Sequence, residues 1–248
     1  MKVIGVIPSR YASTRLPGKP LIDLNGKSMI RRVWEGAREA TSLSRLVVAT
    51  DDERVAEECS SFGAEVVLTP SSLASGTDRI AYACELLQEQ FDVIVNIQGD
   101  EPLLRGTVID RLVAALSAGN MDVTTPVQQI GTYEELINPA VVKVVMNTKG
   151  RALYFSRSPV PFLRDIPNRE WSNHHTFWKH IGLYAYTQAA LKRFISLPPS
   201  PLEQLEALEQ LRLLEDGASF QCIEIDDILL AVDTPEDAAR VRAVLNTL

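Results

Sequence analysis

The stretch DVIVNIQGDEP, residues 92–102, joins a short apolar run to a polar turn that carries two acidic side chains. Three other short runs are equally rich in β-branched residues: VIGVI at 3–7, RLVVAT at 45–50 and EVVL at 65–68. Continuous apolar strands of this length indicate burial on both faces, which is typical of parallel sheets. Because helical stretches separate these runs, the pattern predicts an α/β fold built on a mostly parallel, doubly wound sheet.

The segments between the runs have helical periodicity. In SMIRRVWEGAREA, residues 28–40, the apolar side chains fall on one helical face, namely Met29, Ile30, Val33 and Ala37. ERVAEECSSFG and TDRIAYACELLQE continue the same rhythm. Near the carboxyl end we expect a strand, ILLAV at 228–232, and then a helix that Thr234 caps, that Pro235 begins and that ends near Leu245.

Residues from about 128 to 175 depart from this alternation. The strand-like runs VVKVVMN and ALYFSRSPVPF are followed by a polar, turn-rich stretch where a crossover helix would be expected. We interpret the segment as an insert in a single domain that spans 1–248. Its aromatic and proline content suits a dimer contact or a substrate wall, and an ordinary surface excursion is the alternative.

Regular structure returns at KHIGLYAY, residues 179–186, and a helix is predicted in LEQLEALEQLRLLEDG. The preceding Ser200 and Pro201 are typical of a helix start, and Gly217 is typical of a helix end. Four leucines form one apolar stripe along this helix: Leu202, Leu205, Leu208 and Leu211.

The composition bounds the class of protein. The 248 residues include 25 Lys plus Arg against 32 Asp plus Glu, and the net charge of −7 excludes a generally basic nucleic-acid binder. With 46% apolar and 23% charged residues, the chain resembles a folded globular protein. No apolar run approaches the roughly 18 residues that cross a bilayer, and MKVIGVIP is too short for a signal segment. We therefore expect no membrane insertion and a cytoplasmic location.

The three cysteines, Cys59, Cys84 and Cys222, are odd in number and widely spaced. This pattern favours buried thiols over a disulfide framework or a zinc site.

A cationic loop, SRYASTRLPGKPL at 9–21, follows the first strand of an otherwise acidic chain. It concentrates groups that bind phosphate, namely Arg10, Ser13, Thr14, Arg15 and Lys19. Gly18 lets the backbone approach an anion closely. The alternative is a solvated basic loop, but ligands of such sheets bind beyond the carboxyl ends of the strands, so the position favours a polyphosphate.

Two other nucleotide motifs are excluded. Gly26, Lys27 and Ser28 match the end of a P-loop, but Leu21 stands where that motif requires its first glycine. The chain has no G-x-G-x-x-G fingerprint. These two departures argue against a P-loop kinase and a dinucleotide-dependent dehydrogenase.

Two aspartates stand directly after predicted strands. Asp100 follows VIVNIQ and Asp233 follows ILLAV. Each is also compatible with a helix cap. Magnesium uses one or two carboxylates together with substrate phosphates and water, so this pair could share one ion.

Eight blocks occur in order and cover almost the whole chain: SRYASTRLPGKPL, ATDD, SGTDRIA, NIQGDEP, ALYFSRSPVPF, KHIGLYAY, SPLEQLEALEQLR and VDTPED. Together they resemble the 3-deoxy-manno-octulosonate (KDO) cytidylyltransferase family. The resemblance implies a glycosyltransferase-A-like nucleotidyltransferase fold and a homodimeric enzyme. Such an enzyme transfers CMP from CTP to the 2-hydroxyl of KDO, releases pyrophosphate and serves lipopolysaccharide biosynthesis.

The resemblance also implies roles for residues of the matching blocks. The nucleotide-binding set would be Arg10, Ser13, Arg15, Lys19, Ser75, Gly76, Arg79 and Gln98. The catalytic set would be Lys19, Asp100 and Asp233, with the two aspartates as ligands of Mg²⁺. The sugar-binding set would be Arg157, His180, Tyr184, Tyr186, Glu209 and Gln210.

Some alternatives remain open. Leu73 stands where family members often carry His, and Ala231 where they often carry Gly. These departures allow a related acceptor such as an amino-KDO, and a non-catalytic sugar-nucleotide-binding protein is the rival from another class. Taken alone, His180 also suits a core histidine, Arg157 a surface cation, and Glu209 and Gln210 the wet face of a helix. His174 and His175 are expected to be exposed rather than metal ligands.

Overall fold

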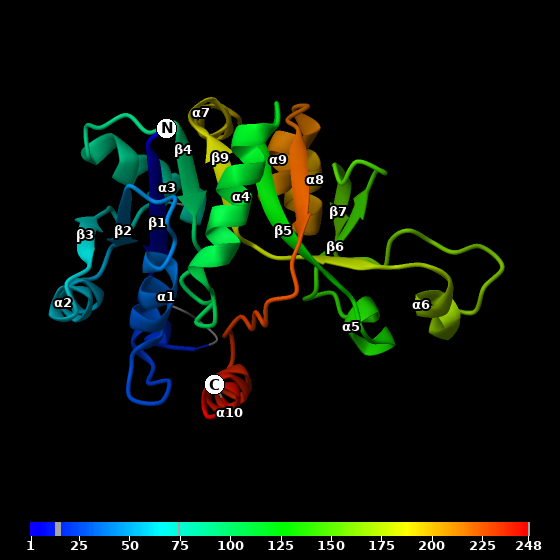
Figure 1. Cartoon of the computed structure of the whole chain (residues 1–248), viewed down its shortest axis with the longest axis horizontal. Helices are drawn as coiled ribbons and strands as arrows, with labels where there is room; N and C mark the ends of the chain where they lie inside the picture. Colours follow the sequence, from blue (N-terminus) through cyan, green and yellow to red (C-terminus); the bar gives the residue numbers. More distant parts are fainter. Residues whose placement is uncertain (13–15, 74, 248) are drawn as a thin grey trace. The chain divides into compact units, whose positions relative to one another are not determined.

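The computed structural model describes residues 1–12, 16–73 and 75–247. The chain divides into two compact units, of which unit 1 comprises 1–111 with 227–248 and unit 2 comprises 112–226 (Figure 1). The expected insert at about 128–175 falls entirely within unit 2, which extends beyond it on both sides.

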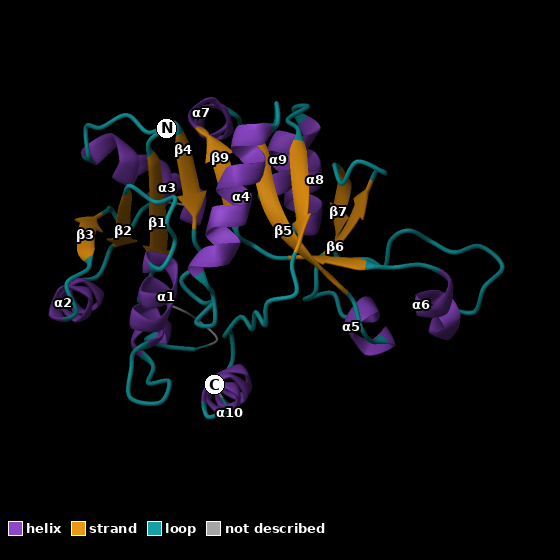
Figure 2. Ribbon diagram, in the orientation of Figure 1, coloured by secondary structure: helices purple, strands orange, loops and turns teal. Residues whose placement is uncertain are grey.

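Unit 1 is built on four parallel strands in the order β3-β2-β1-β4 (Figure 2). Their bounds are Val3–Ser9 for β1, Arg45–Thr50 for β2, Glu65–Leu68 for β3 and Val93–Asn96 for β4. These are the four strands that the apolar runs predict. In the register, Ile4 of β1 lies beside Arg45 of β2 and Ile94 of β4, so the carboxyl ends of β1, β2 and β4 meet at one edge.

The helices of unit 1 begin where the sequence supplies a capping side chain. Ser28, Asp52, Ser75 and Thr234 each accept a hydrogen bond from a backbone N–H of the first turn. The predicted apolar face of the first long helix is buried throughout. The elements are η1 Lys19–Leu21, α1 Met29–Arg38, α2 Glu53–Ser61, α3 Gly76–Leu86 and α10 Pro235–Leu245, while α4, Gly106–Ala118, crosses the boundary between the units.

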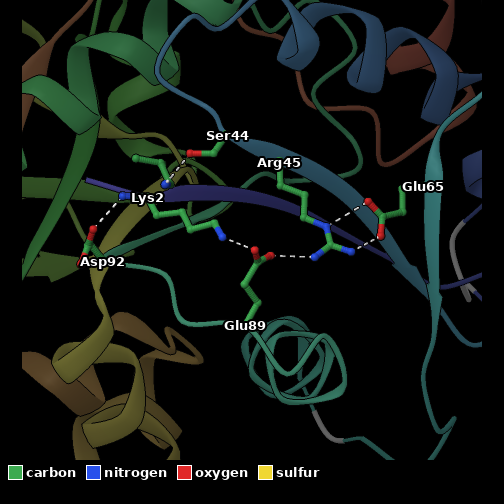
Figure 3. Close-up of polar contacts among 7 residues, drawn as sticks. Lys2, Ser44, Arg45, Glu65, Glu89 and Asp92 are labelled. Atoms are coloured by element: carbon green, nitrogen blue, oxygen red, sulfur yellow. Dashed lines mark hydrogen bonds and ion pairs between the residues drawn. The ribbon is translucent and has the colours of Figure 1, made fainter.

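The amino edge of the unit 1 sheet carries a network of exposed and half-exposed ion pairs (Figure 3). Glu89 accepts hydrogen bonds from Lys2 and from Arg45, and Arg45 also binds the Glu65 carboxylate through two nitrogens. The backbone N–H of Lys2 donates to Asp92 at 2.6 Å. The network joins the starts of β1, β2 and β3, and in it Lys2, Arg45, Glu65 and Glu89 each have an opposite charge as a partner.

Unit 2 is a mixed sheet. Its central strand β5, Val123–Gln129, pairs parallel with β10, Phe220–Glu224, and antiparallel with β8, Trp178–His180, and β9, Tyr184–Thr187. β6, Lys143–Met146, pairs antiparallel with β7, Ala152–Ser156, and with β8. The remaining elements are α5 Tyr133–Ile137, η2 Asn168–Glu170, α6 Trp171–His174, α7 Gln188–Ser196, α8 Pro201–Glu206 and α9 Gln210–Glu215. The parallel arrangement predicted from the first half of the chain therefore applies to unit 1, whereas most pairings in unit 2 are antiparallel.

Two predicted elements near the carboxyl end are wrong. Residues 228–232 form no strand: Leu230 and Val232 pack into a small core, Ile228 is 61% exposed, and the strand lies earlier, at β10. The single helix predicted after Ser200 is two short helices, because Ala207 adopts a left-handed backbone with φ 51°. The break leaves Leu205 82% exposed, although Leu208 and Leu211 are buried.

The exposure of the three cysteines and of two histidines was also predicted from the sequence. Cys59 and Cys222 are buried as predicted, and burial raises the pKa of each to about 12. Cys84 is half-buried, contrary to prediction. His174 and His175 are exposed as expected. Among the described residues, we find no helix with the length and apolar character of a membrane span.

Candidate active site

The carboxyl edge of the unit 1 sheet brings Asp100 next to Asp233. Gly99 permits the close passage of this turn, since a Cβ there would lie 3.0 Å from the Pro8 carbonyl oxygen at the end of β1. The Asp100 carbonyl then accepts a hydrogen bond of 2.9 Å from the Val232 backbone N–H. This main-chain bond holds Asp100 and Asp233 close together, although 133 positions separate them in the sequence.

A small apolar core holds the second aspartate in that position. Its buried members are Leu24, Met29, Val232, Ala238 and Val241. Val232 directly precedes Asp233, and Ala238 and Val241 lie on α10, so the helix is packed against the start of α1. A capping box between Thr234 and Asp237 begins α10, and the Asp237 carboxylate also accepts from the Asp233 N–H at 3.2 Å. Asp233 is therefore held from both sides along the chain.

The Lys19 ammonium bridges the two carboxylates. Its Nζ lies 2.7 Å from Asp100 Oδ2 and 2.9 Å from Asp233 Oδ1, and only 15% of its side chain is exposed. Burial lowers the pKa of Lys19, but the charges and hydrogen bonds of Asp100 and Asp233 outweigh that effect and raise the pKa above 10.5. Lys19 is consequently a fixed cation at neutral pH and does not act there as a base.

The donor set at this point fits a magnesium ion. Asp100 and Asp233 supply hard carboxylate oxygens that converge on one position, and that position already holds a positive charge. No third acidic, His or Cys ligand completes a metal cluster among residues 1–12, 16–73 and 75–247. An ion held by two carboxylates would complete its coordination with water and substrate phosphate, which is the usual arrangement for Mg²⁺. The metal role of the two aspartates stays a prediction that this geometry supports.

The loop predicted to bind phosphate, residues 9–21, is described in part. Gly18 has φ 67°, a left-handed conformation that favours glycine, and it begins the turn η1 that carries Lys19. The exposed Arg10 donates through its guanidinium to the main-chain carbonyl of Leu73, so the change from His at that position leaves this contact untouched. Ser13, Thr14 and Arg15 lie outside the described residues, and their predicted roles stay predictions.

Other residues of the predicted nucleotide set have different surroundings. Ser75 caps α3 and forms a capping box with Asp78, with Gly76 as the first helical residue. Gln98 donates to the Asn96 side chain at 3.1 Å, just beyond β4. Both positions are half-buried at the carboxyl edge of the sheet.

Arg79, which the resemblance places in the nucleotide-binding set, lies inside the protein, and its predicted role stays a prediction. Its side chain is fully buried, and it donates to Thr69 and, at 3.0 Å, to Asp51. Burial is the largest cause of its lowered pKa, which the Arg10 charge lowers further and Asp51 partly restores. Arg79 therefore joins the ends of β2 and β3 from inside the protein.

Within unit 2, three residues of the predicted sugar set form a cluster. The His180 ring lies 5.3 Å from the ring of Tyr184, and Tyr184 stacks on Tyr186 at 5.5 Å. His180 also meets Phe155 edge-on at 5.0 Å. The charge of Glu209 contributes to the raised pKa of Tyr184, after burial and Tyr186.

The hydrogen bonds of Thr125 assign the tautomer of His180. The Thr125 hydroxyl lies 2.9 Å from the Leu183 carbonyl and 3.1 Å from the Ile181 carbonyl, both of which can only accept. Its oxygen must therefore accept from His180 Nε2–H at 3.0 Å, which leaves Nδ1 as an acceptor. Burial lowers the pKa of His180 to about 3, so the ring is neutral at pH 7.

Arg157 has several hydrogen bonds within the protein, and its predicted sugar-binding role stays a prediction. Its guanidinium donates to three main-chain carbonyls, those of Glu206 at 2.7 Å, Pro139 at 2.9 Å and Ala207 at 3.2 Å. These bonds use three of the five guanidinium N–H groups and fix the side chain, while one N–H on each of Nη1 and Nη2 remains for a ligand carboxylate. Glu209 is exposed, whereas Gln210 is buried with no hydrogen-bond partner for its Nε2, contrary to a wet-face position.

Several residues of these sites were missed in the sequence. Asp51 lies in the quoted ATDD block, and Glu206 lies in SPLEQLEALEQLR, but neither stands out there from its acidic neighbours. Lys143 is fully buried in β6. Its position in the middle of the apolar run VVKVVMN could have indicated a buried lysine. Thr125 carried no signal, since a threonine in a strand is ordinary.

Comparisons with known proteins agree with this architecture. A family model described as cytidylyltransferase matches residues 4–225. The 3-deoxy-manno-octulosonate cytidylyltransferase of Syntrophobacter fumaroxidans is 47% identical over 99% of this chain and 97% of that protein. The protein of the same name from Parabacteroides distasonis is 45% identical over 99% of this chain and 98% of that protein.

The fold of this chain is also similar to those of solved structures. The structure of CMP:2-keto-3-deoxy-manno-octonic acid synthetase complexed with CTP has a TM-score of 0.91 and 38% identity, covering 100% of this chain and 99% of that one. A cytidylyltransferase from Leptospira borgpetersenii, at 17% identity, a TM-score of 0.64 and coverage of 100% and 88%, shows the same fold. These similarities confirm the predicted nucleotidyltransferase fold.

Proposed function

Since this chain belongs to the 3-deoxy-manno-octulosonate cytidylyltransferase family, we propose that it transfers CMP from CTP to the 2-hydroxyl of KDO and releases pyrophosphate. The product CMP-KDO serves lipopolysaccharide biosynthesis in this proposal. The main support for this proposal is that Asp100 and Asp233 both bind the Lys19 ammonium at the carboxyl edge of a parallel sheet. This edge is where open α/β sheets bind their ligands.

The nucleotide side of the reaction is chiefly electrostatic. Asp100 and Asp233 would hold Mg²⁺, which when bound neutralises charge on the α-phosphate and lowers the pKa of the attacking hydroxyl. Lys19, which stays protonated, and the exposed Arg10 are the described cations of the phosphate loop, and they stabilise the negative charge that develops on the leaving pyrophosphate. The bond from the KDO oxygen to the α-phosphorus forms as the bond to the β-phosphate bridging oxygen breaks.

Little covalent chemistry is left for the protein in such a transfer. Positioning and preorganised charge supply most of the acceleration. The firm placement of Asp100 and Asp233 by the main-chain bond and the small core is what such preorganisation requires.

The acceptor side offers neutral hydrogen-bonding groups. His180 presents a bare Nδ1, Gln210 has a side-chain N–H group without a partner, and Glu209 is exposed. Hydroxyl groups of a sugar acid can donate to His180 Nδ1 and to the Glu209 carboxylate, and they can accept from the Gln210 N–H group. We assign these residues to the acceptor together with Tyr184 and Tyr186.

The test is an assay of pyrophosphate release with CTP, MgCl₂ and KDO, in which the product is identified by mass. CMP-KDO is the expected product, and turnover should require Mg²⁺. UTP and ATP in place of CTP test the base, and an amino-KDO in place of KDO tests the related acceptor that Leu73 and Ala231 leave open. Tight binding of CTP without turnover under all these conditions would instead indicate the non-catalytic alternative.

We also propose a homodimer and a cytoplasmic location. The exposed apolar side chains of Phe162 and Leu153, 75% and 57% exposed, lie in the expected insert and support a subunit contact there. Light scattering on the purified chain measures the mass of the assembly, and cell fractionation measures the location.

A further inference from the structure

The junction between α8 and α9 breaks a sequence that should be helical throughout. Ala207 has the highest helix propensity of any residue type, yet it adopts φ 51° and ψ 52°, a left-handed conformation with a steric cost for any residue that has a Cβ. Leu211 N–H bonds to Leu208 O rather than to the carbonyl of Ala207. A break of this kind persists only where its surroundings impose it.

Glu206 and Arg157 impose the break through reciprocal hydrogen bonds. The Glu206 carboxylate accepts from the Arg157 backbone N–H at 2.9 Å and from the Ser156 hydroxyl at 2.7 Å. In return, the Arg157 guanidinium donates to the main-chain carbonyls of Glu206 and Ala207. In a continuous helix, those two carbonyls would accept hydrogen bonds from the N–H groups of the residues four positions later. The end of β7 therefore satisfies the groups that the break leaves without helical partners.

The break decides where the acceptor residues point. It ends α8 at Glu206 and starts α9 at Gln210, so Glu209 and Gln210 open the second helix instead of continuing the first. A bidentate pair across the junction, Arg212 to Glu203 at 2.7 and 2.6 Å, holds the two helices together. Since each residue turns a helix by about 100°, any change at Ala207 would rotate Glu209 and Gln210 away from their present directions.

We propose that Glu206 is a positioning residue for the acceptor: through Arg157 and the left-handed turn at Ala207, it orients Glu209 and Gln210. This inference rests on the proposed function, because it needs these two residues to contact the sugar acid. It also gives Arg157 an indirect part in acceptor binding, which fits its bonds to main-chain carbonyls.

Steady-state kinetics with CTP and KDO test the proposal. Glu206→Ala should raise the KM for KDO at least tenfold and leave the KM for CTP within twofold. Glu206→Gln should stay within threefold of the wild type for both substrates, because its amide oxygen can accept from Arg157 N–H while its NH₂ donates to Ser156. Gln204→Ala, on the exposed side of α8, is the matched control and should change neither KM.

A second substitution separates positioning from a loss of stability. Glycine adopts the left-handed conformation without a steric cost, so Ala207→Gly added to Glu206→Ala should recover at least a third of the lost affinity for KDO. If Glu206→Ala does not fold, Ser156→Ala removes one bond to the same carboxylate and should raise the KM for KDO two- to fivefold.

Three results would overturn the inference: equal changes in both KM values, a change in kcat alone, or no recovery by Ala207→Gly in a folded double variant. An unchanged KM for KDO in Ser156→Ala would overturn it in the case where Glu206→Ala does not fold. Failure of the proposed function is a different outcome, since the wild-type chain itself would then form no CMP-KDO.

Discussion

The two edges of the unit 1 sheet use charge in opposite ways. At the amino edge, Glu89 lies between Lys2 and Arg45, whose side chains are 45% and 30% exposed (Figure 3). At the carboxyl edge, Asp100 and Asp233 share the single ammonium of Lys19, which is 15% exposed. The first arrangement pairs charges across strands, whereas in the second two carboxylates from distant parts of the chain share a mostly buried ammonium.

The difference teaches where charge is placed for stability and where for chemistry. Exposed ion pairs contribute little, because water screens them and long side chains lose entropy when they are fixed. A partly buried excess of negative charge costs stability unless a cation offsets it. In the function that we propose, a divalent cation and a polyphosphate bind at the carboxyl edge, and the cation offsets this cost. Substitutions at either edge should therefore differ in their effects on turnover and on stability.

Asp100→Asn should lower turnover by about a hundredfold or more, comparable to the removal of one preorganised charge-stabilising group. The variant should fold, because the Asp100 main-chain bond to Val232 does not involve the side chain. Pyrophosphate release at saturating MgCl₂ and circular dichroism measure the two effects. Glu65→Gln at the amino edge is the control. Near-normal turnover of Asp100→Asn would remove this residue from the catalytic set.

Lys143 extends the contrast to unit 2, since its buried ammonium donates to two main-chain carbonyls, those of Asn138 and Val141. Burial is the main cause that lowers its pKa to about 8, with a further decrease from Arg157 and a partial increase from Glu206. Between about pH 8 and 10.5 the unfolded chain binds this proton and the folded chain does not, so stability should rise with pH in that window.

The expected gain for Lys143 is at most about 3 kcal/mol across the window. Urea unfolding between pH 7.5 and 10 measures it, and Lys143→Met should abolish this part of the pH dependence. An identical slope in the variant and the wild type would show that Lys143 is not the group that titrates.

Lys19→Met should leave Asp100 and Asp233 without their shared cation. We expect the free energy of unfolding to fall by about 1 kcal/mol, since both carboxylates are partly exposed and water screens their repulsion. Because Mg²⁺ would then be the main cation for the pair, MgCl₂ should stabilise this variant more than the wild type. Lys27→Met, which breaks a surface pair with Glu35, is the matched control. Equal stabilisation of Lys19→Met and the wild type would argue against a metal site at the two aspartates.

Glu89→Gln should have the smallest effect. The substitution removes one charge from an exposed network, so we expect a change below about 1 kcal/mol in stability, and this change should decrease further at high salt. Turnover should not change. A loss of activity in this variant would mean that the two edges of the sheet are not independent.

The amino-acid sequence by itself determined the elements whose signals are local. The apolar runs predicted β1 to β4, and capping side chains such as Ser28 and Thr234 predicted where helices begin. It also predicted both aspartates and Lys19 as site residues, because each follows a strand or lies in a cationic loop at the edge where ligands bind. Family resemblance, carried by ordered blocks over nearly the whole chain, predicted the fold and the reaction.

Only the tertiary structure decided the features that depend on distant partners. The helix break at Ala207 could not be predicted, because Arg157, fifty positions away, supplies the hydrogen bonds that replace those of the helix. Leu230 and Val232 of the run ILLAV pack into a small core rather than into a sheet, and local composition does not distinguish the two. The sequence also did not show that Arg157 and Arg79 donate to carbonyl and carboxylate groups of the protein, because those acceptors lie far away along the chain. Local propensity favours a helix or a strand in each segment. Hydrogen bonds to distant residues in the folded chain decide whether that element forms.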